Sequence, residues 1–174
     1  VDTLLLRDGT EGFAVLGQAY VALKFEDQIA TFYRQLVNQP EVNLQDNRMV
    51  PNTFEAVSLK GDLGPVSYYG GFLFGMKKRN SDEFINMAKA AGVTEEDSDM
   101  WLGGLEFTPI EDLKFRTSLY AVSDLLASSY SDAVWTTPTG ADSKLRLSGQ
   151  FMYQGRIGDD LLMECSCDTW AAGA

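Results

Sequence analysis

Hydrophobic and polar residues alternate along much of the chain. At 13–25 the odd positions are apolar or small, whereas the even positions are mixed and include Gln18 and Lys24. The same alternation returns at 113–122 and, most regularly, at 145–154. A period of two is that of a β-strand, whose successive side chains point to opposite faces of a sheet. The pattern therefore predicts long strands with one apolar face and one polar or mixed face.

Two further segments fit a strand less cleanly. At 66–76 the even positions form an apolar face, but Leu73 adds a large apolar side chain to the other face. At 53–62 neither face is clearly apolar, so the alternation leaves open whether Glu55 and Lys60 face water.

The connections between these segments alternate between short turns and long polar loops. Residues rich in Gly, Pro and Asp mark tight turns at 26–27, 61–65, 109–112 and 139–143. Longer connections follow at 38–52, 81–100 and 155–168, with a brief one around 125–129. Strands of about ten residues with short turns at one end and long loops at the other are typical of a transmembrane β-barrel. We expect an all-β fold, a curved antiparallel partial-barrel sheet of about nine strands, with a short helix at 83–91 inside a loop.

A soluble antiparallel sandwich or barrel also alternates, so single segments do not separate the two classes. Strand length favours the membrane, because strands of soluble proteins are usually near five or six residues. Aromatic residues also gather near the predicted strand ends, where the interfacial girdle of a membrane barrel would lie. These residues are Phe13, Phe25, Trp101, Phe107, Phe115 and Tyr153.

Composition excludes several classes of function. The net charge of -11 argues against nucleic-acid binding, which requires Lys and Arg to neutralise phosphates. The chain has no His, the usual general base and zinc ligand. Cys165 and Cys167 together supply at most half of a tetrahedral metal site, so we interpret them as incidental loop thiols. We expect no catalytic residues, no metal and no cofactor.

The ends of the chain indicate an internal piece of a longer protein. The sequence lacks an initiator Met and the basic start, apolar middle and cleavage site of a secretory signal. It ends at 170–174, within a predicted strand. We expect residues 1–174 to form a single partial-barrel domain.

Several runs resemble the OprD-like family of outer-membrane porins. Residues 24–35, beginning Lys24-Phe25-Glu26-Asp27, and 46–55, beginning Asp46-Asn47-Arg48, are similar to the family's constriction-loop region, as is 77–84. Ser118-Leu119-Tyr120 and Ser148-Gly149-Gln150-Phe151 are similar to the strands that follow. Family members are barrels of about eighteen strands, so the resemblance implies roughly half of one barrel.

The resemblance also implies location, partners and function. It implies a bacterial outer-membrane protein in contact with the lipid bilayer, with its lipopolysaccharide-type outer leaflet, and with small-molecule solutes. The function implied is passive, selective diffusion of small solutes, carboxylate-bearing nutrients or amino acids, with no covalent chemistry.

Basic side chains form a ladder along one wall of the pore in this family, and Lys24 falls at such a position. Arg34, Arg116 and Arg146 are further candidates for substrate binding, because each lies on the non-lipid face as phased from its own strand. A charge on the lipid face near midplane costs about 2–4 kcal/mol, whereas a charge in a wet lumen stays solvated. The alternative for each residue is a solvated wall charge that touches no solute.

The segment 37–52 is the candidate constriction loop, with an ordinary surface loop as the alternative. Its polar residues available to line a pore are Glu41, Asn43, Asp46, Asn47 and Arg48.

Two other functions compete with the porin. A soluble all-β binding module would hold a ligand with Tyr20, Tyr33 and Tyr120. An outer-membrane barrel enzyme would need a catalytic base from outside this chain.

Overall fold

The computed structural model describes residues 14–40, 42–45, 51–93, 97–140, 143–158 and 168–174. Strands dominate this part of the chain. The strands are β1 (Ala19–Phe25), β2 (Gln28–Gln35), β3 (Thr53–Leu63), β4 (Val66–Lys77), β5 (Phe84–Ile85), β6 (Met100–Ile110), β7 (Leu113–Val122), β8 (Leu126–Pro138), β9 (Lys144–Arg156) and β10 (Thr169–Gly173). The helix α1 spans Met87–Ala91.

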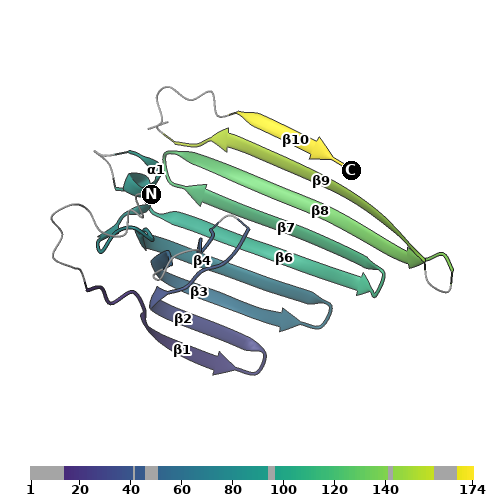
Figure 1. The fold of residues 1–174 in the computed structure, drawn as a ribbon, viewed down its shortest axis with the longest axis horizontal. Helices are drawn as coiled ribbons and strands as arrows, with labels where there is room; N and C mark the ends of the chain where they lie inside the picture. The colour runs from purple at the N-terminus through teal and green to yellow at the C-terminus, as the bar shows by residue number, and fades with distance from the viewer. Residues whose placement is uncertain (1–13, 41, 46–50, 94–96, 141–142, 159–167) are drawn as a thin grey trace, which may run out of the picture.

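All strands belong to one antiparallel sheet in which chain neighbours lie side by side (Figure 1). The order is β1-β2-β3-β4-β6-β7-β8-β9-β10, and the two-residue β5 pairs with the end of β4. The sheet does not close on itself in the described residues, where β1 pairs with β2 alone and β10 with β9 alone. The all-β partial barrel is thus confirmed, with nine strands on the main path and β5 in addition.

The two ends of the sheet differ, as expected from the turns. Short connections at 26–27, 64–65, 111–112 and 139–143 lie at one end (Figure 1). At the other end the connections are 36–52, 78–99 and 157–168, together with the short 123–125. Glu26 and Asp124 have φ of 51° and 58° in two of the tight turns, and Gly64 has φ of 61° in a third.

The expected helix at 83–91 is shorter than predicted. Phe84 and Ile85 pair with β4 as a strand. The helix begins only after Asn86, whose side chain accepts a hydrogen bond from the Lys89 backbone N–H at 2.7 Å. It ends at Gly92, which has φ of 105°. The side-chain cap at Asn86 explains why the first predicted turn of the helix is absent.

The sheet has one face lined by large apolar side chains, which we call the apolar face. Register and alternation place these residues together although they come from eight strands. Members of the apolar face with exposed side chains include Val21, Leu23, Phe25, Phe32, Val57, Leu59, Trp101, Leu105, Phe107, Phe115, Leu119, Trp135, Leu145, Leu147, Phe151, Tyr153 and Trp170. An exposed apolar surface this broad is not tolerated in water by a monomeric protein, and it fits contact with lipid.

Aromatic rings pair on this face near the strand ends. Phe107 and Phe115 stack with ring centroids 6.4 Å apart beside the β6–β7 turn. Phe72 and Trp101 lie 4.5 Å apart where β6 begins. Phe13, which the sequence placed in the same girdle, lies outside the described residues.

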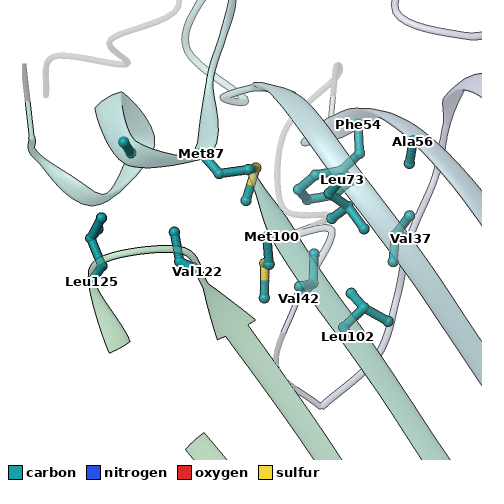
Figure 2. Close-up of a cluster of buried hydrophobic side chains, with 11 residues drawn as sticks. Val37, Val42, Phe54, Ala56, Leu73, Met87, Met100, Leu102, Val122 and Leu125 are labelled. Atoms are coloured by element: carbon teal, nitrogen blue, oxygen red, sulfur yellow. The ribbon is translucent and has the colours of Figure 1, made fainter. Parts of the chain in front are cut away.

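The opposite face, which we call the polar face, carries a local hydrophobic core near the long connections. This core contains Val37, Val42, Phe54, Ala56, Leu73, Met87, Ala88, Met100, Leu102, Val122 and Leu125 (Figure 2). Leu73 is fully buried in it, which explains the large apolar residue on the otherwise polar side of 66–76. A register shift between Glu55 and Ala56, opposite Phe74, marks the place where β3 and β4 pass beneath the core.

Candidate functional site

A segment after β2 lies across the polar face. Val37 and Val42 are 7% and 6% exposed and share the core with Leu73 and Leu102 of the sheet (Figure 2). Between them, Gln39 and Val42 exchange two backbone hydrogen bonds of 2.9 and 3.1 Å, which close a tight turn. The described part of the predicted constriction loop therefore packs onto the sheet instead of extending away from it.

Asn52 fastens the other end of this segment. Its backbone N–H donates to the Leu44 carbonyl at 2.9 Å and its side-chain amide to the Asn43 carbonyl at 3.1 Å. Asn43 itself is exposed, and its side chain accepts a hydrogen bond from the Gln45 backbone N–H at 2.6 Å. The other residues predicted to line the constriction, Glu41, Asp46, Asn47 and Arg48, lie outside the described residues.

Two hollows flank the segment on the polar face. One has a volume of about 410 Å³ and is lined by β1–β4 with Tyr20, Gln35 and Lys60. The other has a volume of about 540 Å³ and is lined by β6–β8 with Glu106, Arg116, Ser118, Tyr130 and Asp132. Gln39 of the segment and Tyr69 of β4 border both hollows.

Ion pairs neutralise basic side chains at and beside the second hollow. The Arg116 guanidinium binds Asp132 through two bonds, Nε to Oδ1 at 2.9 Å and Nη2 to Oδ2 at 2.8 Å. The Asp132 side chain is only 4% exposed, so this carboxylate depends on Arg116 for its compensation. Lys114 binds Glu106 at 2.7 Å on the neighbouring strands. The positive charge of Arg116 is therefore paired with a carboxylate within the sheet.

Lys24, Lys60 and Arg146 are basic residues of the polar face that make no ion pair within the described part of the chain. Lys24 and Lys60 lie on one register line across β1–β3, each opposite Ile29, and Lys60 faces the first hollow. Arg146 lines a third, smaller hollow of about 210 Å³ next to Arg116. The structure thus settles the facing of Lys60, which the alternation alone had left open.

Arg34 differs from its expected phase. The strand register places Arg34 opposite Ala19 and Glu55. Its neighbour Gln35 lies on the polar face, where its side-chain oxygen accepts a hydrogen bond from the Ser58 hydroxyl. Arg34 therefore lies on the other side of the sheet. Its Nε donates to Glu55 at 2.9 Å, and its guanidinium lies 4.2 Å from the Phe84 ring centroid. The opposite charges of Arg34 and Glu55 pair across β2 and β3, a partnership that alternation within one strand does not reveal.

No helix in the described residues is long and apolar enough to span a membrane. No group of three or more His, Cys, Asp or Glu side chains there is arranged to hold a metal ion. Cys165 and Cys167 lie outside this part of the chain.

A family profile described as "outer membrane porin, OprD family" matches residues 10–174. Among solved structures, the chain is similar to a BenF-like porin from Pseudomonas fluorescens Pf-5, with 18% identity over 91% of this chain and a TM-score of 0.72. It is also similar to OccK8 (OprE) of Pseudomonas aeruginosa, with 19% identity over 84% of the chain and a TM-score of 0.70. OpdQ of the same organism gives 15% identity over 81% and a TM-score of 0.69.

The chain spans 42%, 37% and 40% of the length of these three structures, respectively. A search among curated proteins returned no match. The similarity to solved structures establishes the barrel fold, and the profile covers nearly the whole chain. The chain belongs to the OprD family of outer membrane porins.

Proposed function

We propose that residues 1–174 form about half of the wall of a channel through which small solutes diffuse passively across the bacterial outer membrane. The observation that carries this proposal is the division of one sheet into an apolar and a polar face. The apolar face suits lipid on its outside, and the polar face carries charges and hollows that suit a water-filled lumen. Strands of 10 to 13 residues in β6–β9 are long enough to cross a bilayer at a tilt.

The segment 37–52 would narrow this lumen. Its described part is anchored on the polar face by Val37 and Val42, which favours a constriction over a free surface loop. Glu41, Asn43, Asp46, Asn47 and Arg48 remain the proposed polar lining of the constriction. Pore width and the groups at the narrowest point would then set selectivity.

The proposed solutes are small anions, carboxylate-bearing nutrients or amino acids. Lys24, Lys60 and Arg146 make no ion pair among the described residues, and their positive charge on the polar face attracts anions into the pore. Arg116 contributes less, because Asp132 neutralises it. Arg34 is assigned to holding β2 and β3 together through Glu55 rather than to solute binding.

A channel is favoured over a soluble binding module. The soluble module would have to expose the whole apolar face to water, at a cost of about 25 cal/mol for each Å² of apolar surface. A channel is also favoured over an enzyme, since the chain contains no His to act as general base. An esterase assay on the whole porin is expected to show no turnover.

Planar-bilayer recording on the whole porin that contains this chain tests the proposal. We expect discrete conductance steps and, under a salt gradient, a reversal potential that indicates preference for anions. A protein that folds in detergent yet produces no conductance steps would overturn the channel. Conductance steps with a preference for cations would support the channel function but overturn the proposed class of anionic solutes.

A further inference from the structure

We infer that Tyr69, held flat over Gly104, separates the two hollows and limits the size of solute that passes Gln39 of the overlying segment. This inference rests on the proposed channel function and adds a specificity-determining residue to it. The sequence pattern did not single out either residue.

The position of the Tyr69 ring follows from the register of β4 and β6. Tyr69 lies directly opposite Gly104, and Gly104 lies opposite Ser118 of β7. A methyl group built on Gly104 would meet the Tyr69 hydroxyl oxygen at 2.6 Å and would come closer still to ring carbons. The ring therefore occupies the space in which a side chain of residue 104 would stand, and it lies across β6.

Glycine is needed at 104 and not at its neighbour. Gly103 lies on the opposite face, and a methyl group there would meet only the Tyr69 backbone oxygen, at an ordinary 3.6 Å. The two glycines are adjacent in one strand and have no positive φ. A comparison of the two positions thus separates the effect on the Tyr69 ring from any general effect of alanine in β6.

The hydrophobic core supports the ring from the side of the long connections. Tyr69 is partly buried and packs against the core that contains Val37, Val42, Leu73 and Leu102. With the core on one side and the bare backbone of Gly104 beneath, the ring has little freedom to change its position. It is a fixed part of the wall.

The Tyr69 ring lies at the border between the two hollows. Tyr69 from the sheet and Gln39 from the overlying segment are the residues that border both hollows, within the linings described above. One hollow presents Lys60, and the other presents the Arg116–Asp132 pair together with Glu106. Because Tyr69 and Gln39 form the shared border of the two hollows, we expect a solute that moves from one hollow to the other to pass Tyr69. The height of the ring above the sheet then sets the clearance.

Single-channel recording on the whole porin tests the inference with Tyr69→Ala, Gly104→Ala and Gly103→Ala. Tyr69→Ala removes the divide, so we expect higher conductance and weaker discrimination between small and large anions. Gly104→Ala lifts the ring toward Gln39, so we expect lower conductance and stronger exclusion of large anions. Gly103→Ala should match the wild type.

The double variant Tyr69→Ala/Gly104→Ala provides the decisive comparison. With the ring gone, a methyl group at 104 has nothing to lift, so the double variant should behave like Tyr69→Ala. An equal loss of conductance from Gly104→Ala with and without the ring would overturn the inference, as would an unchanged conductance in Tyr69→Ala. If Gly104→Ala does not fold, Tyr69→Ala is compared with Tyr69→Phe instead. Tyr69→Phe keeps the ring, so it should retain the discrimination between small and large anions that Tyr69→Ala loses. Absence of conductance in the wild type would instead count against the proposed channel.

Discussion

The charged residues of the polar face fall into those with a carboxylate partner and those without one. Arg116 binds a nearly buried Asp132, whereas Lys24, Lys60 and Arg146 stand without an ion pair within the described residues. Both kinds look alike in the sequence, because each is a basic residue at a polar position of an alternating strand. Only the cross-strand register separates them. Asp132 is 16 residues from Arg116, and the register of β7 and β8 is what brings them together.

Arg146→Ala in the whole porin should lower anion preference without affecting folding. The exposed guanidinium has no ion-pair partner among the described residues, so its removal leaves no buried charge uncompensated. The reversal potential in a salt gradient measures the shift. The effect should shrink at high salt, since screening shortens the reach of a charge to about 3 Å at 1 M. If the variant and the wild type have the same ion selectivity at low salt, Arg146 is a solvated wall charge that does not influence the solute.

Arg116→Ala should behave differently, with a loss of stability as its main effect. The Asp132 side chain is 4% exposed beside Arg116, and removal of the guanidinium leaves this carboxylate without its partner, at a cost of about 1–3 kcal/mol. The temperature at which the folded barrel is lost on heating in detergent measures this change. Arg146→Ala is the matched control and should leave that temperature unchanged. An Arg116→Ala barrel as heat-resistant as the control would contradict the assigned pairing.

At the scale of strands and loops, alternation predicted the sheet well where one face is uniformly apolar. β9 follows the expected phase throughout, because no other element packs on it in the described residues. The prediction was weakest at 53–62 and 66–76, where the segment 36–45 buries Leu73 and the register shifts at Glu55. Because a local core places apolar residues on the polar face, the two faces of these strands no longer differ in hydrophobicity, which is the difference that alternation detects. The helix boundary was wrong for a local reason, the cap at Asn86.

Two neighbouring residues of β9 test its assigned faces. Phe151 lies on the apolar face, and Met152 lies on the polar face opposite Tyr130. Phe151→Arg should destabilise the barrel in lipid by about 2–4 kcal/mol if it lies near midplane, whereas Met152→Arg should cost far less. Urea unfolding in liposomes gives both values, and both variants replace an apolar side chain with the same charge. Equal costs, or a greater cost for Met152→Arg, would contradict the assignment of faces.

The segment across the polar face should depend on its buried valines. Val42→Ser removes apolar contact from a side chain that is 6% exposed, at a cost of about 1–2 kcal/mol. The segment should then leave the sheet more often, so single-channel current should become noisier and higher on average. Leu36→Ser is the control, because Leu36 is 40% exposed. Identical current noise in the two variants would show that Val42 does not hold the segment in place.

At the scale of the whole molecule, the described residues form one open sheet whose two outermost strands are β1 and β10. β1 and β10 each have one strand neighbour in the described residues, and unpaired strand edges are not stable within a hydrocarbon layer. Together with the share of the solved porins that the chain spans, this supports a barrel completed by further strands. The apolar face then lies outside and the polar face inside, which is the central claim of the proposed function.

Thiol labelling along β9 tests that claim most directly. In the whole porin with Cys165 and Cys167 replaced by Ser, single cysteines are placed at successive positions from 145 to 154. A water-soluble, membrane-impermeant reagent should modify the even positions, which face the lumen, and should leave the odd positions unmodified in lipid. Modification of both sets alike would contradict a membrane barrel, and the reverse pattern would place the lumen on the wrong face of the sheet.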